Sequence, residues 1–172
     1  MEIVIQLIGI AAMLGSVLSF QCNKHKSIMI MQIIATALFG IQYYFLGAFT
    51  GMALDAVGIV RDVVFYHKDK KWAQSVWWTV LFAVAMAVVG IITYQNYISL
   101  LMIVAMVLNT VSFSFTKPKL VRSTILISSP FLLVYNILTG SWGGVINEAF
   151  SEVSSLVGLL RYDVKKNKKE SE

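Results

Sequence analysis

Residues 47–66 read GAFTGMALDAVGIVRDVVFY, an apolar segment that nevertheless carries three charged residues, Asp55, Arg61 and Asp62. Residues 140–159 read GSWGGVINEAFSEVSSLVGL and repeat its pattern of glycines and acids. At a constant separation of 93 residues, the equivalent positions are Gly47 and Gly140, Gly51 and Gly144, and Asp55 and Glu148. This internal repeat predicts the architecture of the chain.

The repeat extends over two shorter motifs. At the same separation, Ser19-Phe20 aligns with Ser112-Phe113, and Lys24-x-Lys26 aligns with Lys117-x-Lys119. Chance matches in an apolar sequence would fall mainly on leucine, isoleucine, valine and alanine, whereas these matches include serine and lysine. We therefore expect two copies of one structural unit.

The composition is that of an integral membrane protein. Of the 172 residues, 58% are hydrophobic and 13% are charged, whereas about a quarter of the residues of a typical soluble domain are charged. The mean hydropathy is +0.75. The formal net charge is +5, but the lysines and arginines gather in short clusters between apolar runs. Because such clusters set membrane topology, we expect the lipid bilayer as a partner and no nucleic acid.

The sequence offers no support for enzymatic chemistry. It contains no recognisable pair of nucleophile and base, no phosphate-binding glycine loop and no cluster of metal-ligand residues. The single cysteine, Cys22, has no partner for an internal disulfide. We expect a protein that is not an enzyme and has neither a cofactor nor a metal site.

Seven apolar runs follow one another along the chain, at about residues 3–20, 27–46, 51–66, 72–92, 98–115, 120–138 and 142–160. Most approach the ~20 residues that cross about 30 Å of hydrocarbon as an α-helix. We therefore predict an all-α membrane protein with seven transmembrane helices in a 3+1+3 arrangement. Two parallel three-helix bundles, residues 1–71 and residues 97–172 with a basic tail, are joined by a linker helix within residues 72–96.

Basic residues predict the orientation. Lysines and arginines lie after the first, third, fifth and seventh runs, while the connections at residues 47–50, 93–97 and 139–141 contain none. Since basic residues near helix ends are retained in the cytoplasm, we expect a multi-pass inner-membrane protein with its N-terminus outside and its C-terminus in the cytoplasm. The first run lacks a basic leading segment and a small-residue cleavage site, so we expect it to remain as a membrane helix.

This topology with a parallel repeat resembles the PQ-loop and SWEET transporter superfamily. More closely, residues 41–47, IQYYFLG, the glycine-bearing turn after them and the basic connection after the third run resemble the YgjV-type family of bacterial inner-membrane proteins. Phe20-Gln21 and Phe113-Ser114 stand where the superfamily has Pro-Gln. The resemblance implies a solute path between the bundles, with central polar residues from the third and seventh helices. By position, these residues are Asp55, Gly58, Asn147 and Ser151.

Polar side chains form a stripe on both of these helices. At about 100° per residue, Asp55 and Asp62 nearly eclipse each other, as do Glu148 and Ser155. Lipid does not satisfy such groups, so the stripes face protein or water. They serve either to hydrogen-bond packed helices or to line a functional cavity, which the cost of intramembrane carboxylates favours for the acids. The candidate solute-binding residues are Asp55, Gly58, Asn147, Glu148 and Ser151, and weaker candidates are Gln32, Gln42, Tyr135 and Asn136.

Arg61 needs a carboxylate partner within hydrocarbon, because arginine stays protonated. Asp62 points about 100° away around the helix, whereas Glu152 is expected within reach on a facing seventh helix. We therefore predict that Arg61 bridges the third and seventh helices through Glu152, with Asp62 or Ser155 as second acceptor, and closes the cytoplasmic half of the path. The alternative is that Arg61 extends to the cytoplasmic interface.

The sequence thus predicts a transporter that moves a small polar solute by alternating access between the two bundles. The alternative is a membrane receptor or scaffold that binds a ligand in the same cavity without moving it. Asp55 and Glu148 occupy equivalent positions where limited water favours the protonated carboxyl, so proton coupling is a further hypothesis. The sequence does not specify the solute, and it is compatible with an oligomer.

Overall fold

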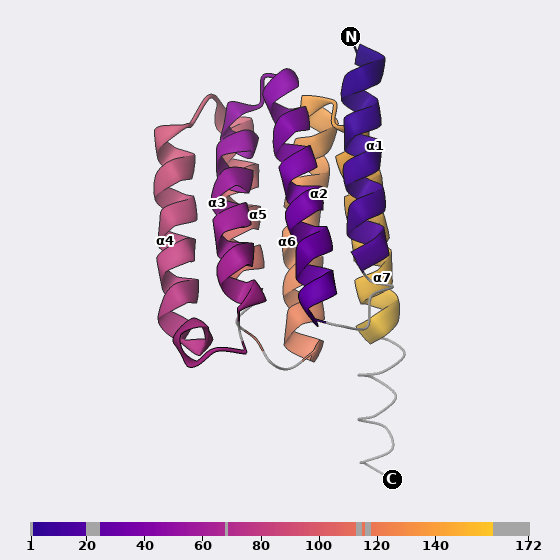
Figure 1. The fold of residues 1–172 in the computed structure, drawn as a ribbon. Helices are drawn as coiled ribbons and strands as arrows, with labels where there is room; N and C mark the ends of the chain where they lie inside the picture. The colour runs from indigo at the N-terminus through magenta and orange to yellow at the C-terminus, as the bar shows by residue number, and fades with distance from the viewer. Residues whose placement is uncertain (1, 20–24, 68, 113–114, 116–117, 160–172) are drawn as a thin grey trace.

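The structure, a computed structural model, describes residues 2–19, 25–67, 69–112, 115 and 118–159 (Figure 1). Within these residues the chain forms seven α-helices and one short 3-10 helix, with no β-strand. The elements are α1 (Glu2–Ser19), α2 (His25–Phe45), α3 (Phe49–Tyr66), η1 (Lys71–Gln74), α4 (Val76–Ile92), α5 (Tyr97–Ser112), α6 (Pro118–Thr139) and α7 (Trp142–Gly158). The predicted all-α chain with seven helices is confirmed at this level.

The main difference from the predicted boundaries lies before α4. The apolar run begins at Trp72, but η1 covers this position and α4 begins only at Val76. Ser75 separates the two elements with extended backbone, and its side chain accepts a hydrogen bond from the amide of Trp77 at 3.3 Å. A serine cap satisfies an amide that has no partner within the helix, so α4 begins later than hydropathy alone predicts.

Six of the helices form a ring. α1 packs against α2 and α7, α3 packs against α2 and α5, and α6 packs against α5 and α7. α4 lies outside this ring, against α3 and α5. Figure 1 shows the helices side by side, with α4 at one edge. The interior of the ring is therefore enclosed by α1, α2, α3, α5, α6 and α7.

Helix boundaries recur at the separation that the sequence repeat has. α1 and α5 end at equivalent positions, α2 and α6 begin at equivalent positions, and so do α3 and α7. The pairs of boundary residues are Ser19 and Ser112, His25 and Pro118, and Phe49 and Trp142.

The turns before α3 and α7 are also equivalent. Gly47 and Gly140 have positive φ angles of 71° and 75°, a conformation that glycine adopts without the strain a side chain would add. The next amide closes each turn, because Ala48 donates to the carbonyl of Tyr43 and Ser141 donates to the carbonyl of Asn136, both at 2.9 Å. Each turn thus reverses the chain with the same hydrogen bond.

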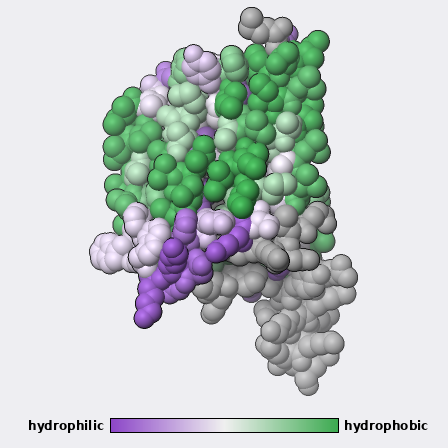
Figure 2. All heavy atoms as spheres, viewed as in Figure 1, coloured by the Kyte–Doolittle hydropathy of each residue, from purple (hydrophilic) through white to green (hydrophobic). Residues whose placement is uncertain are grey.

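The outer surface of the bundle is apolar along its sides. Large hydrophobic side chains are exposed on every α-helix, and Figure 2 shows them covering the sides of the visible face, with hydrophilic residues at one end. By length and composition, two helical segments of the described residues can cross a membrane, Glu2–Ser19 and Lys119–Thr139. Three further apolar helical segments are shorter, Met29–Phe45, Val76–Ile92 and Tyr97–Ser112.

Candidate functional site

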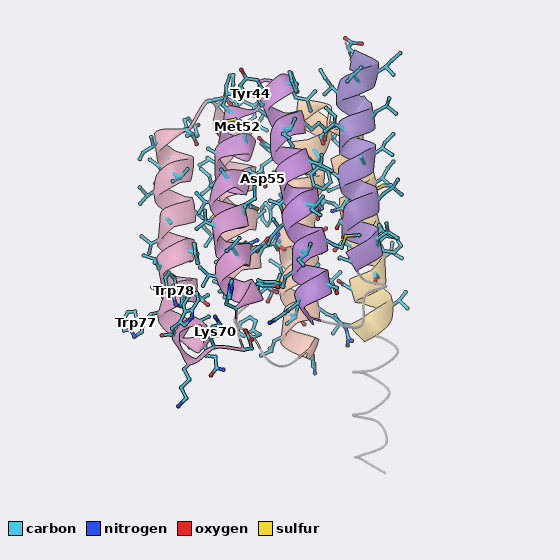
Figure 3. The ribbon with its side chains drawn as sticks, in the orientation of Figure 1. Tyr44, Met52, Asp55, Lys70, Trp77 and Trp78 are labelled. Carbon is cyan, nitrogen blue, oxygen red and sulfur yellow. The ribbon has the colours of Figure 1, made fainter. Side chains whose placement is uncertain are left out.

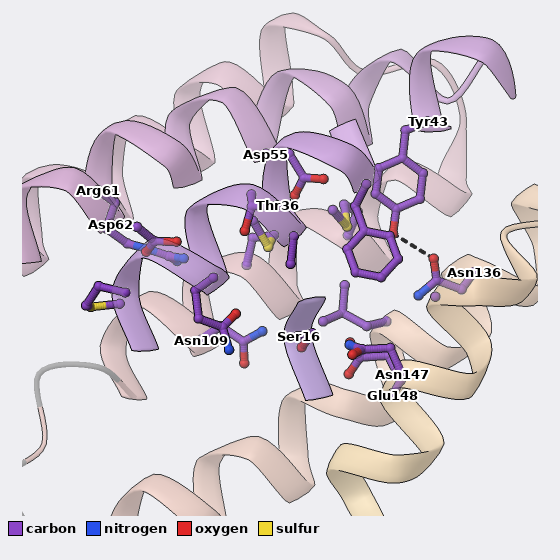
Figure 4. Close-up of a pocket in the computed structure, with 18 residues that line it drawn as sticks. Ser16, Thr36, Tyr43, Asp55, Arg61, Asp62, Asn109, Asn136, Asn147 and Glu148 are labelled. Atoms are coloured by element: carbon purple, nitrogen blue, oxygen red, sulfur yellow. Dashed lines mark hydrogen bonds and ion pairs between the residues drawn. The ribbon is translucent and has the colours of Figure 1, made fainter. Parts of the chain in front are cut away.

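A cavity of about 140 Å³ lies inside the ring. Every ring helix contributes to its lining and α4 does not, as Figure 4 shows for the labelled side chains. Polar and charged groups form much of this lining although the helices are apolar outside. The lining residues are Ser16, Met29, Gln32, Ala35, Thr36, Phe39, Tyr43, Asp55, Arg61, Asp62, Met102, Met106, Asn109, Leu132, Asn136, Gly144, Asn147 and Glu148.

The lining contains pairs of residues that lie 93 residues apart, the separation found in the sequence. Each pair places one residue from α1–α3 and one from α5–α7 on the same cavity. The pairs are Ser16 and Asn109, Phe39 and Leu132, Tyr43 and Asn136, and Asp55 and Glu148. Both halves of the helix ring therefore contribute to the cavity at matching positions.

One end of the cavity is closed by two tyrosines. The phenol of Tyr43 donates to Oδ1 of Asn136 at 2.6 Å, and the phenol of Tyr135 accepts from the amide of Gly51 at 3.1 Å. The two rings meet edge to face with centroids 5.6 Å apart, an arrangement that aromatic rings prefer. A side chain at position 51 would collide with the phenol of Tyr135, so glycine is required for this contact.

A second polar layer lies beyond the tyrosines, toward the N-terminal end of α1. Ser141 donates to Oε1 of Gln42 at 2.8 Å, and Gln42 donates to Oε1 of Gln6 at 3.4 Å. Gln6 in turn donates to the carbonyl of Gly140 at 2.8 Å. These bonds join α1, α2 and the turn before α7, so the cavity is closed by hydrogen bonds across the ring as well as by packing.

Two carboxyl groups line the cavity at equivalent positions but in different surroundings. Asp55 is 6% exposed, and its Oδ2 is buried with no hydrogen-bond partner. Glu148 accepts a hydrogen bond at each oxygen, from Ser129 at 2.8 Å and from Asn147 at 3.1 Å. Asp55 is therefore the carboxyl group whose hydrogen-bonding capacity the protein leaves unfilled.

Arg61 and Asp62 form a buried ion pair in the lining. Nε of Arg61 donates to Oδ1 of Asp62 at 2.9 Å, and Nη1 donates to the hydroxyl of Thr110 on α5 at 3.0 Å. Arg61 is 5% exposed and Asp62 is 2% exposed. The predicted alternative, in which Arg61 extends to the interface, does not fit this burial.

The structure pairs Arg61 with the adjacent Asp62, which was predicted as the second acceptor, and not with Glu152, which was predicted as the main partner. The helix across from Arg61 is α5, which supplies Thr110, since the main neighbours of α3 are α2, α4 and α5 and not α7. Ser155 lies buried on α7 and, like Glu152, does not line the cavity.

The structure brings together part of the predicted solute-binding set. Asp55, Asn147 and Glu148 line the cavity, whereas Gly58 and Ser151 do not. Gly58 is instead a packing position, because a Cβ there would touch Met106 and Thr36 at 3.6 Å. Solute binding by these lining residues stays a prediction.

Sequence reasoning missed several lining residues. Ser16, Thr36, Tyr43 and Asn109 line the cavity, yet none belongs to the polar stripes of the third and seventh helices. The repeat contained a usable signal, because Ser16 is equivalent to Asn109 and Tyr43 is equivalent to Asn136. Polar residues that recur at a separation of 93 residues therefore also indicate lining positions, in addition to the polar stripes on single helices.

Asp55 also borders a lateral groove on the outer surface. This groove, about 450 Å³, lies between α2 and α3 and is almost entirely apolar. Figure 3 labels Tyr44, Met52 and Asp55 along it. The small residues Gly40 and Ala56 leave the space beside the carboxyl group. Among the described residues, Asp55 is the one that lines both the groove and the central cavity.

One comparison with known proteins gives a match. The family model Imp-YgjV, described as bacterial inner membrane protein, matches residues 3–166. No curated protein matches the chain, and no solved structure does.

Proposed function

We propose that this chain, which belongs to the Imp-YgjV family of bacterial inner membrane proteins, is a transporter that moves a small polar solute through its central cavity. The cavity carries the proposal, because polar and charged side chains gather inside a ring of helices whose outer faces are apolar. Intramembrane charges are costly and are typical of substrate and ion pathways. A cavity of this kind is expected to bind a polar solute.

In this proposal all seven α-helices cross the inner membrane. The segments shorter than a full span are accommodated by thinning of the bilayer and by snorkelling of flanking residues. The described lysines at helix ends, Lys26, Lys70, Lys71 and Lys119, favour a cytoplasmic location for that end of the bundle. The N-terminus then lies outside and the C-terminus inside. The equivalent boundaries and turns support two parallel three-helix units joined by α4.

Alternating access is the mechanism that two such units favour. The bonds between Tyr43 and Asn136, and between Gly51 and Tyr135, each join one unit to the other at the outer end of the cavity. Rocking the units apart at this end would break both bonds and expose Asp55 and Glu148 to the outside. The closed outer layer corresponds to one of the two end states.

Flux through the purified protein tests the proposal. A panel of labelled small polar solutes is offered to proteoliposomes, and uptake is compared with that of empty liposomes. In a Cys22→Ser background, Asn147→Cys places a thiol in the cavity, and Val60→Cys places one on the exposed face of α3, away from both the cavity and the lateral groove, as a matched control. A bulky thiol reagent should abolish uptake by the Asn147→Cys protein and leave uptake by the Val60→Cys protein unchanged.

The alternative of a receptor or scaffold gives a different result. A solute that stabilises the purified protein but never accumulates in proteoliposomes would overturn transport and favour ligand binding without movement. Uptake that survives modification of Asn147→Cys would place the path outside the cavity.

A further inference from the structure

Four ionisable side chains with formal charge line the central cavity, Asp55, Arg61, Asp62 and Glu148. Arg61 and Asp62 lie 2.9 Å apart and neutralise each other. Among the residues that the structure describes, no lysine and no other arginine lines the cavity. The two carboxyl groups at equivalent positions, Asp55 and Glu148, therefore give the cavity an excess of acidic groups.

One oxygen of these acids has no hydrogen-bond partner. Oδ2 of Asp55 is buried and accepts no hydrogen bond, and the side chain is 6% exposed. In Figure 4 the carboxyl group points from α3 toward the middle of the labelled side chains. A buried acceptor without a donor is destabilising, because it has lost its hydrogen bonds to water and gained none in the protein. A ligand that brings a donor or a positive charge would remove this cost.

The uncharged side chains of the lining favour an organic cation over a metal ion. Phe39 and Tyr43 present aromatic rings, and Met102, Met106 and Leu132 present apolar or polarizable groups. Aromatic rings attract organic ammonium groups, and thioethers adapt to irregular apolar ligands. Calcium and magnesium instead require six or more oxygen ligands, and no three histidine, cysteine or acidic side chains gather among the described residues. The lining therefore fits a cation with an apolar body.

The volume limits the size of that cation. A cavity of about 150 Å³ holds one benzene molecule, and the cavity here measures about 140 Å³. A short alkylammonium ion is of the size that this space holds.

We infer that the solute bound in the central cavity is a small organic cation, an alkylammonium ion held between Asp55 and Glu148. Asp55 is its main counter-ion, because Glu148 already accepts hydrogen bonds from Ser129 and Asn147. This inference rests on the proposed function, since it names the solute class of the same cavity.

Binding to the purified full-length protein in detergent tests the inference without any measurement of flux. The probes are n-propylammonium, the neutral n-propanol and the anionic propionate, which share a three-carbon chain and differ in charge. Sodium chloride is the inorganic control. Thermal unfolding and titration calorimetry report binding, since a ligand of the native state raises the unfolding midpoint. Propylammonium should stabilise the protein, and the other three should not.

Two variants assign the counter-ion. Asp55→Asn removes the charge at nearly constant shape and should weaken propylammonium binding at least about tenfold. Asp69→Asn removes a carboxylate outside the cavity, where Asp69 pairs with Lys26 at 3.3 Å, and should leave binding unchanged. If Asp55→Asn does not fold, Glu148→Gln takes its place and should weaken binding by a smaller factor.

The outcomes separate the solute class from transport. Equal stabilisation by propylammonium and propanol, stabilisation by sodium alone, or no binding of propylammonium would overturn the inference. Propylammonium binding without uptake into proteoliposomes would keep the cation site and overturn the transporter. Uptake of a neutral or anionic solute by a protein that does not bind propylammonium would keep the transporter and overturn the cation site.

Discussion

Tyr43 donates a hydrogen bond to Asn136 at 2.6 Å across the ring, and the two residues lie 93 residues apart, the separation found in the sequence (Figure 4). The bond joins α2 to α6, two helices that are not neighbours in the ring. Because the pair also lines the cavity, a change here should affect the stability of this end of the cavity directly.

Tyr43→Phe should destabilise the protein by about 1–3 kcal/mol, because it leaves Oδ1 of Asn136 buried without its donor. Replacing both partners, as in Tyr43→Phe with Asn136→Leu, should recover part of this loss, since no unpaired polar group remains. Thermal unfolding in detergent measures both effects. Tyr44→Phe is the matched control, because Tyr44 is exposed. An equally large loss of stability in Tyr44→Phe would contradict the role assigned to the hydrogen bond between Tyr43 and Asn136.

Gly143→Ala should separate α1 from α7. A Cβ at position 143 would collide with the backbone carbonyl of Gly9, and backbone does not move aside as a flexible side chain does. Overpacking of this kind costs about 1–3 kcal/mol. Gly15→Ala is the control on α1, because a Cβ there meets Ala35 at an ordinary 3.6 Å. Alanine also has a higher helix propensity than glycine, so this variant should not lower the unfolding midpoint. Unfolding midpoints that fall for Gly15→Ala and not for Gly143→Ala would contradict the close approach of the two helices.

The sequence predicted the helices well and their neighbours less well. Hydropathy and the repeat located all seven α-helices, because each apolar run is bounded by a polar or glycine-bearing connection. Glu152 was predicted as the main partner of Arg61 and Asp62 only as the second acceptor, because helical periodicity describes the faces of one helix and not the order of helices around the ring. In the structure α5 rather than α7 is a main neighbour of α3, and the acidic partner described for Arg61 is Asp62.

The candidate site was predicted in part for a similar reason. Asp55 and Glu148 stood out because an acid in an apolar helix is costly wherever it lies. Ser16 and Asn109 are single polar residues on α1 and α5, and a lone serine or asparagine commonly hydrogen-bonds neighbouring helices. Their shared position on the cavity depends on how the two copies face each other, which only the folded arrangement specifies.

The orientation in the membrane is tested with single cysteines in a Cys22→Ser background. Gln95→Cys, in the exposed connection between α4 and α5, should react in intact cells with a thiol reagent that does not cross membranes. Lys70→Cys, exposed at the opposite end, should react only after the cells are opened. Thr50 is unsuitable for this purpose, because it is 0% exposed and donates a hydrogen bond to the carbonyl of Thr93. Labelling of Lys70→Cys in sealed cells would reverse the proposed orientation.

The ion pair of Arg61 and Asp62 is tested by a double-mutant cycle. Arg61→Met leaves the carboxylate of Asp62 buried and unpaired, and breaking one side of a buried pair costs about 3–5 kcal/mol. The double variant with Asp62→Leu should recover much of this loss, because two apolar side chains of similar volume replace two charges. The unfolding midpoint of each variant in detergent gives the coupling between the two positions.

Glu152 provides the decisive comparison for this pair. Since Arg61 bonds Asp62 and Thr110, the effects of Arg61→Met and Glu152→Gln should simply add. A coupling of Arg61 with Glu152 as large as its coupling with Asp62 would restore the bridge to α7 and contradict the arrangement described here. The exposed ion pair of Lys26 and Asp69, at 3.3 Å, is the control for the effect of losing an ion pair on stability. Its half-exposed side chains remain solvated, so Lys26→Gln should leave the unfolding midpoint close to that of the wild type.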